Sequence, residues 1–218
     1  MPELSFSPKE IAEGRKLFAG EWRFVSAAAS VAALPPPRGI EVAFAGRSNV
    51  GKSSLVNALT GRHALARISH TPGRTRELIF FSAVDRWKLV DMPGYGYAAA
   101  AKTKIAAWTD LIRAYLRGRA NLARVYVLVD ARHGIKSPDE AVFDLLDEAA
   151  VSYQVVLTKA DQVAAEALAD CIETTAAALA KRKAAFPEVL ATSARAGSGI
   201  AELRAAVAKL VAEHAGRR

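Results

Sequence analysis

The strongest constraint on the fold is the stretch GRSNVGKS at residues 46–53. It matches the pattern G-x-x-x-x-G-K-S/T, in which glycines let backbone N–H groups close around phosphate oxygens. The pattern works between a strand and a helix, because the helix N-terminus supplies further donors and a positive dipole end. The apolar run EVAFA precedes it and the helical run SSLVNALT overlaps its end. The sequence therefore predicts a strand, a phosphate-binding loop and a helix in succession.

Beyond this unit, apolar runs alternate with helical patterns. Runs that predict strands lie at residues 40–45, 77–84, 87–90, 124–129, 153–157 and 189–191. Helical patterns lie at 52–59, 104–116, 138–149, 163–184 and 200–214. Continuous apolar strands separated by helices are typical of a parallel sheet that is covered on both faces. We therefore expect an α/β fold of three layers around a mostly parallel, six-stranded sheet.

The N-terminal part of the chain has a different character. Ser7 and Glu10 flank Pro8 in the pattern of a capping box, which predicts a helix over residues 8–19. An alanine-rich segment then leads to three prolines at 35–37, which form a stiff linker. We expect three segments, which are an N-terminal extension packed on the domain at 1–37, the domain itself at 38–214 and a basic end at 215–218.

Composition narrows the setting and the partners. The formal net charge of +8 favours an anionic polymer as partner, nucleic acid before membrane, although solubility alone also explains such a charge. Cys171 is the single cysteine, so an intrachain disulfide is impossible and a reducing compartment is favoured. No apolar run approaches the ~20 residues of a membrane-spanning helix. We therefore expect a cytoplasmic protein without membrane contact.

The phosphate loop and two later motifs suit a purine nucleotide. In the phosphate loop, Lys52 would place its ammonium on the outer phosphates, and the Ser53 hydroxyl would ligate Mg²⁺. The run TKAD at 158–161 follows a buried strand, so the Asp161 carboxylate lies where open parallel sheets bind ligands. It can accept two hydrogen bonds from guanine, whereas adenine has no such donor pair; a helix start capped by Asp161 is the alternative. After the last strand, a backbone N–H at 193–195 can meet the guanine oxygen.

The run DMPG at 91–94 predicts a segment that responds to the nucleotide. Asp91 ends an apolar run and would face Mg²⁺ through water, while Gly94 would offer its N–H to the terminal phosphate. The loop beyond would then be a switch that this contact orders. The run HTPGRTR at 70–76 lies between the first helix and the second strand, where a first switch belongs. In it we favour Thr75 as ligand of Mg²⁺ and the γ-phosphate.

The runs GRSNVGKSSLVN, TPGRTR, DMPGYGYA, TKAD and SAR, in this order, resemble the EngB family within the translation-factor-related bacterial GTPases. The resemblance covers residues 22–212. It implies a Ras-like P-loop GTPase fold and a cytosolic GTPase that uses GTP, GDP and Mg²⁺. Because members act on the large ribosomal subunit, it also implies a role in 50S assembly, with pre-50S particles and rRNA as partners, and a requirement for normal cell division. Separately from the resemblance, we expect a monomer.

The resemblance also implies roles for individual residues. Phosphates and Mg²⁺ would be bound by Gly46, Arg47, Ser48, Asn49, Val50, Gly51, Lys52, Ser53 and Ser54. The two switches would contribute Gly73, Thr75, Asp91, Pro93 and Gly94. The base would be bound by Thr158, Lys159, Asp161, Ser193 and Ala194. The residues implied in catalysis are Lys52, Thr75 and Gly94, and those implied at the metal are Ser53, Thr75 and, through water, Asp91.

Three positions give this chain its own features. Tyr95 follows the D-x-x-G motif where Ras-like enzymes have a glutamine that orients the attacking water, which predicts slow hydrolysis completed by an external factor. Thr158 stands where many GTPases have asparagine. This threonine is expected to remove one side-chain tether of the base loop, which is the loop at 158–161 that would bind the base. By the same resemblance, Asn49 suggests K⁺ as an added positive charge; a hydrogen bond within the loop is the alternative.

Other functions remain open at this point. A P-loop ATPase or small-molecule kinase would share the phosphate loop, and a nucleotide-controlled interaction protein would need no RNA. Basic residues that fit either RNA phosphates or solvated helix faces are Arg113, Arg117, Arg119, Arg124 and the run at 181–183. Trp108 lies on the apolar face of a helical pattern and is expected in the core.

Overall fold

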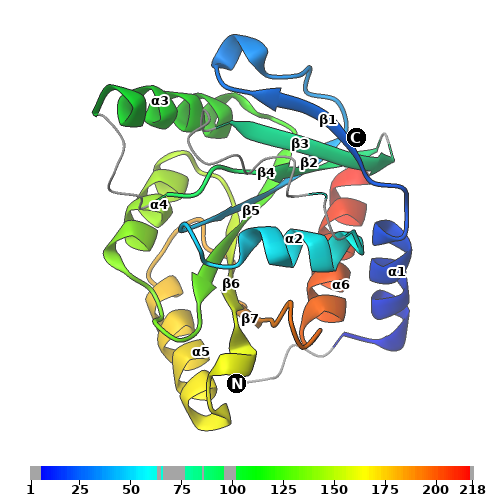
Figure 1. Cartoon of the computed structure of the whole chain (residues 1–218), viewed down its shortest axis with the longest axis vertical. Helices are drawn as coiled ribbons and strands as arrows, with labels where there is room; N and C mark the ends of the chain where they lie inside the picture. The colour runs from blue at the N-terminus through cyan, green and yellow to red at the C-terminus, as the bar shows by residue number, and fades with distance from the viewer. Residues whose placement is uncertain (1–5, 63–64, 66–76, 85, 96–101, 217–218) are drawn as a thin grey trace.

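The apolar runs pair into a seven-stranded sheet in the order β1-β3-β4-β2-β5-β6-β7 (Figure 1). The structure is a computed structural model that describes residues 6–62, 65, 77–84, 86–95 and 102–216. The strands are β1 (Arg23–Ala28), β2 (Ile40–Gly46), β3 (Leu78–Val84), β4 (Trp87–Asp91), β5 (Leu122–Asp130), β6 (Tyr153–Thr158) and β7 (Leu190–Ala191). β3 runs antiparallel to both of its neighbours, and the other neighbouring pairs are parallel. The mostly parallel sheet is confirmed, with seven strands in place of the expected six.

β1 is the strand that the sequence analysis missed. It pairs antiparallel with β3, which places Arg23 opposite Ser82 and Ala28 opposite Leu78. A bulge interrupts this pairing between Phe24 and Ser26. Because the strand is short and rich in small residues, its local pattern does not distinguish it from a loop. Pairing with β3 therefore decides its conformation, and it extends the sheet by one edge strand.

Helices cover both faces of the sheet (Figure 1). One face carries α1 (Pro8–Phe18), α2 (Lys52–Thr60) and α6 (Ile200–Ala215), and the other carries α3 (Lys102–Gly118), α4 (Ser137–Glu148) and α5 (Ala165–Leu179). In the described part of the chain, the 3₁₀ turns η1 (Val31–Ala33) and η3 (Ala160–Gln162) lie in the connections. α5 is shorter than the predicted helix at 163–184, because the chain turns back after it and Phe186 N donates to Tyr153 O at 2.6 Å. None of the helices in the described residues has the length and apolarity to cross a membrane.

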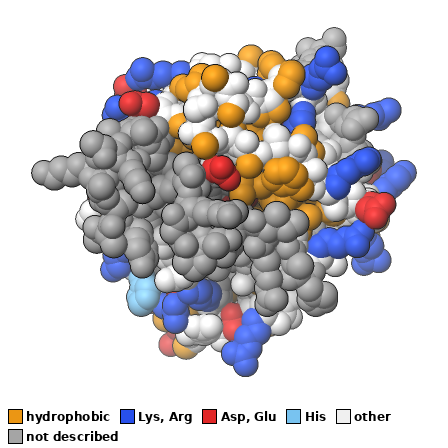
Figure 2. Space-filling view, turned by 45° about the horizontal axis from the view of Figure 1, so that its top comes forward, with side chains coloured by type: hydrophobic (Ala, Val, Ile, Leu, Met, Phe, Trp, Pro, Cys, Tyr) orange, Lys and Arg blue, Asp and Glu red, His pale blue; other side chains and the backbone are white. Residues whose placement is uncertain are grey.

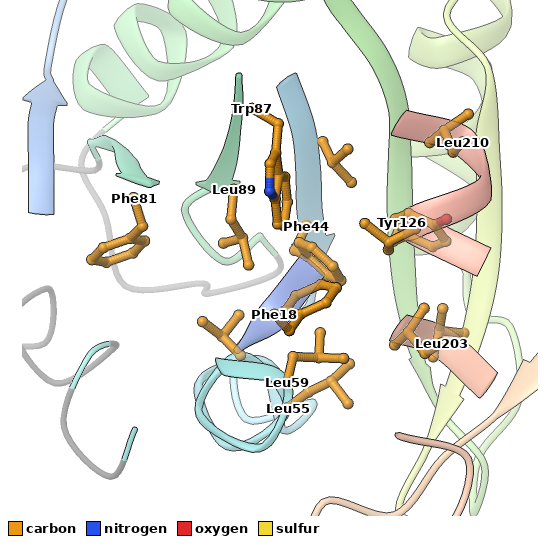
Figure 3. Packing of buried hydrophobic residues seen from close by; sticks show 14 of the residues in the cluster. Phe18, Phe44, Leu55, Leu59, Phe81, Trp87, Leu89, Tyr126, Leu203 and Leu210 are labelled. Atoms are coloured by element: carbon orange, nitrogen blue, oxygen red, sulfur yellow. The ribbon is translucent and has the colours of Figure 1, made fainter. Parts of the chain in front are cut away.

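Aromatic and leucine side chains fill the layer between the sheet and α1, α2 and α6. Phe18, Trp22 and Trp87 are buried and pack with ring centroids 5.1–5.7 Å apart, which gives both tryptophans a place in the core. Figure 3 shows helix side chains facing strand side chains here, among them Leu55, Leu59, Leu203, Leu210, Phe44 and Tyr126. The prediction for Trp108 falls on a side chain that the structure does not describe. This packing fixes α2 on the sheet, and with it the loop that precedes α2.

Several arginines considered as RNA contacts have structural partners instead. Arg119 is buried and forms a bidentate ion pair with Glu41, with donor–acceptor distances of 2.7 and 2.9 Å. The guanidinium carbon of Arg124 lies 3.8 Å from the centroid of the Phe186 ring. Arg182 pairs with two aspartates of α4. These contacts account for the three arginines within the protein and argue against RNA phosphates as their main partners.

Candidate functional site

The carboxyl end of β2 leads directly into the loop of residues 46–51, as the sequence predicted. Gly51 has a φ of 101° immediately before α2, a backbone conformation that strongly favours glycine. An added Cβ at Gly46 would lie 2.7 Å from Val50 Cγ1, so the loop packs against its own first residue. Val50 itself is buried. The expected order of strand, glycine-containing loop and helix is therefore confirmed, and phosphate binding by the loop stays a prediction.

Lys52 and Asp91 form a buried ion pair at this edge. β4 pairs in parallel with β2 and sets Asp91 opposite Phe44, while Met92 N donates to Phe44 O at 2.9 Å. The side chains of Lys52 and Asp91 are 8% and 3% exposed, so each charge depends on the other for compensation. Phosphate oxygens would compete with Asp91 for the ammonium and release this carboxylate toward a cation.

The residues at this edge fit a magnesium ion. Asp91 and Ser53 bring a carboxylate and a hydroxyl, and Mg²⁺ prefers oxygen ligands from few side chains together with substrate phosphates and water. Among the described residues no group of three or more His, Cys, Asp or Glu side chains forms an all-protein metal site. The predicted first-switch residues Gly73 and Thr75 lie outside the described residues.

The loop after β6 is tied to the phosphate loop by two side chains. The Thr158 hydroxyl donates to Val50 O at 2.6 Å, and Lys159 Nζ donates to Asn49 O at 2.8 Å. The expectation that threonine at this position removes a tether is wrong, because Thr158 is itself a tether to the phosphate loop. Lys159 adopts a φ of 58°, which directs the chain into η3. The two predicted loops therefore form one connected unit.

Asp130, at the end of β5, is a site residue that the sequence analysis did not single out. Its carboxylate lies 2.9 Å from Lys159 Nζ and 2.7 Å from Arg132 Nη2. Burial raises the pKa of Asp130, but hydrogen bonds from Arg132 and Lys159 outweigh burial and hold this pKa well below its usual range. Asp130 therefore stays ionised and positions Lys159. The sequence pattern that could have indicated Asp130 is its position directly after a predicted parallel strand, because ligands bind at the carboxyl ends of such strands.

The predicted base-binding residues meet at the ends of β6 and β7. Asp161 is exposed, and its carboxylate has no partner among the residues that the structure describes. The two loops are joined where Ala160 N donates to Thr192 O at 3.1 Å. Ser193 N donates to Ser198 O at 2.9 Å, so its N–H is occupied, whereas the Ala194 N–H has no partner in the described chain. Ala194 is therefore the better candidate to bind a base oxygen.

The Tyr95 side chain is buried and reaches α4. Its hydroxyl donates to Asp139 Oδ1 at 2.9 Å, and its backbone forms a bridge with Arg47 of the phosphate loop. Burial and the neighbouring Asp139 raise the pKa of the Tyr95 phenol, so the phenol remains protonated and donates. Sequence reasoning missed Asp139, which lies 44 residues further along the chain. Pro93 and Gly94 connect Tyr95 to Asp91, so this motif is folded against the phosphate loop.

Comparisons with known proteins match most of the chain to GTP-binding families. A family described as "50S ribosome-binding GTPase" matches residues 41–159, and one described as "Elongation factor Tu GTP binding domain" matches residues 109–213. The probable GTP-binding protein EngB of Rhodopseudomonas palustris strain BisB18 is 64% identical over 207 residues, which cover 94% of this chain and 96% of that protein. Its counterpart in Bradyrhizobium diazoefficiens is also 64% identical over 207 residues, covering 94% and 95% of the two chains.

Solved structures lead to the same family. The crystal structure of a probable GTP-binding protein EngB superposes with a TM-score of 0.63 at 26% identity, covering 79% of this chain and 99% of that chain. Era from Aquifex aeolicus bound to GDP and AlF4⁻ has a TM-score of 0.60 at 20% identity, covering 79% and 57%, and supports the fold alone. With its connected phosphate and base loops and these full-length relatives, the chain belongs to the EngB family of GTP-binding proteins.

Proposed function

We propose that this protein binds GTP and GDP and hydrolyses GTP as a switch in the assembly of the large ribosomal subunit. The observation that carries the proposal is the connection between the phosphate loop and the loop that carries Asp161. Lys159 and Thr158 hold the two loops together through Asn49 O and Val50 O. A ligand that spans both loops would have phosphates at one end and a base with adjacent donors at the other.

Guanine is the base that suits the second loop. The free Asp161 carboxylate can accept hydrogen bonds from the ring N–H and the exocyclic amine, and the Ala194 N–H can donate to the ring oxygen. Adenine offers no such donor pair and would leave the carboxylate unpaired. Calorimetric titration with GDP, the non-hydrolysable GTP analogue GppNHp and ATP tests this assignment. Tight ATP binding with no response to guanine nucleotides would contradict it and favour a P-loop ATPase or kinase.

Hydrolysis would depend on charge at the phosphates. Lys52 would bind the outer phosphates, and Gly94 N–H would bind the terminal one. Ser53 and, through water, Asp91 would hold Mg²⁺, with Thr75 as a further ligand. The metal would neutralise charge that develops on the phosphates during transfer. A Ser53→Ala variant is therefore expected to lose most of the Mg²⁺ dependence of GTP binding.

Intrinsic hydrolysis is expected to be slow. The Tyr95 phenol is bonded to Asp139, so it is not free to orient an attacking water. An external group that supplies charge in the transition state is typically worth ~10³–10⁵ in rate. K⁺ is one such group. The exposed Asn49 side chain has no partner among the described residues, which favours the potassium hypothesis over a bond within the loop. Equal hydrolysis rates in KCl and NaCl at the same ionic strength would eliminate K⁺.

The ribosomal role rests on the family and on charge. The matched family is described as "50S ribosome-binding GTPase", and the net charge of +8 suits an RNA-rich partner. Figure 2 brings the β1 side of the molecule forward and shows hydrophobic side chains with Lys and Arg around them. Large exposed hydrophobic side chains in the described chain are Phe24, Val25 and Val31, on β1 and η1. We also infer a cytoplasmic monomer that supports normal cell division.

Sucrose-gradient sedimentation of the protein with large ribosomal subunits tests this role. Co-migration is expected with GppNHp and not with GDP. The Asp161→Asn variant, which should not bind guanine, is the control and should remain at the top of the gradient. If the wild-type protein binds GppNHp but never co-migrates, the switch acts on another partner and the ribosomal role is wrong.

A further inference from the structure

Tyr95 is held at three points, although it begins a segment expected to switch. Its N–H donates to Gly46 O at 3.3 Å, and its carbonyl accepts from Ser48 N at 3.0 Å. Its hydroxyl donates to Asp139 Oδ1 at 2.9 Å, and the residue is 5% exposed. The first residue after the D-x-x-G motif is therefore fixed to the phosphate loop by its backbone and to α4 by its side chain.

Asp139 is the centre of this arrangement and is fully buried. Besides Tyr95, it accepts a hydrogen bond from Lys136 N at 2.9 Å, and its Oδ2 lies 3.2 Å from Arg47 Nε. It also lies in the first turn of α4, where the helix dipole favours a carboxylate. A buried carboxylate with these partners has little freedom to move. Phe143 packs the same helix into the core, and this packing helps to hold Asp139 in place against the sheet.

Gly94 is placed by its neighbours on both sides. Met92 N is bonded to Phe44 O, and Tyr95 is fixed as described. An added Cβ on Gly94 would lie 3.2 Å from Ser48 Oγ, so Gly94 packs closely on the phosphate loop. The Gly94 N–H has no partner among the described residues. A free donor is therefore held next to the loop that would bind the phosphates.

We propose that Tyr95, Asp139 and Arg47 form an anchor that pre-positions the Gly94 N–H for the third phosphate of GTP. In this arrangement Asp139 and Tyr95 are positioning residues, because they act through Gly94 and do not touch the nucleotide. Ordering the donor before binding lowers the cost of forming its hydrogen bond. GDP lacks the third phosphate, so the anchor favours GTP over GDP. This inference rests on the proposed binding of guanine nucleotides.

Tyr95→Phe is the most conservative test, because it removes only the hydroxyl that binds Asp139. The dissociation constants for GppNHp and GDP are measured by calorimetry in the full-length protein. We expect GppNHp binding to weaken about tenfold and GDP binding to change less than about twofold, since one hydrogen bond to a charged group is at stake. Asp139→Asn keeps the shape and is expected to act in the same direction. The double variant should lose no more than the larger single effect.

Tyr115→Phe is the matched control. Tyr115 is buried as well, and its hydroxyl donates to a carboxylate, Glu41 Oε2, at 3.0 Å, but Glu41 lies near the start of β2, at the end of the strand away from the phosphate loop. Both tyrosine variants are expected to lower the melting temperature, whereas only Tyr95→Phe should change the ratio of the two affinities. If Tyr95→Phe leaves the ratio of the GppNHp and GDP affinities unchanged, whether or not both affinities fall, the proposed anchor is refuted. Failure of the wild-type protein to bind guanine nucleotides would instead refute the proposed function.

Discussion

Thr158→Val tests whether the base loop and the phosphate loop act as one unit. The Thr158 hydroxyl is buried and donates to Val50 O at 2.6 Å and, more weakly, to Val129 O at 3.3 Å. Valine has nearly the same shape but no donor, so the Val50 carbonyl loses this partner. The change removes the shortest side-chain link between the two loops and leaves both backbones intact.

The magnitude follows from that single bond. An unpaired buried acceptor costs about 1–3 kcal/mol of folding free energy. For a chain of this length, a loss of about 2 kcal/mol lowers the melting temperature by roughly 4–8 °C. A nucleotide that spans both loops must restore their alignment when it binds. We therefore expect GDP affinity to fall about tenfold, which corresponds to a loss of ~1.4 kcal/mol of binding free energy.

Thermal unfolding and calorimetry with GDP measure the two effects. Thr192→Val is the matched control, because the Thr192 hydroxyl is also buried and donates to a strand carbonyl, Leu157 O, at 3.0 Å. It should cost similar stability with a smaller effect on GDP. If Thr158→Val loses stability but binds GDP as the wild type does, the coupling argument is refuted. If its stability is also unchanged, the bond itself contributes nothing measurable.

Three further predictions address the base, a buried ion pair and pH. Asp161→Asn turns an acceptor into a donor that faces the exocyclic amine of guanine, so GDP binding should weaken by about a hundredfold or more. XDP has a carbonyl in place of that amine and should bind the variant more tightly than it binds the wild type. Calorimetry measures both affinities. Arg119→Ala leaves the Glu41 carboxylate buried without its ion-pair partner and should lower the free energy of unfolding in urea by about 3–5 kcal/mol. Arg117→Ala, which breaks an exposed ion pair, should lower it by less than about 1 kcal/mol. Because the folded pKa of Asp130 is depressed, its stabilisation is complete above its unfolded pKa of ~3.9 and is lost as pH falls through the folded value. The stability difference between wild type and Asp130→Asn should therefore stay constant above about pH 5 and shrink in more acid solution.

The buried strands of the fold were predictable because their pattern is local. β2, β4 and β6 are buried along their whole length, and such runs read as continuous apolar segments in a sequence. The residues of β1 pass from exposed through half-buried to buried along the strand without alternating, and a bulge breaks its pairing with β3. Its partner lies some fifty residues away, so nothing in its own six residues specifies a strand. The strand conformation of β1 is instead specified by hydrogen bonding to the edge of β3.

The sequence alone determined the loop between β2 and α2, the loop after β6 and their order. Glycine conformations, a lysine at a helix start and a carboxylate after a buried strand are constraints that act between neighbouring residues. Tertiary structure alone decided how these parts are held. The Thr158 tether reaches a carbonyl 108 residues away, and the Tyr95 hydroxyl finds Asp139 across 44 residues. Such bonds depend on the angle and depth at which packed strands and helices deliver each side chain, and no local spacing encodes that geometry.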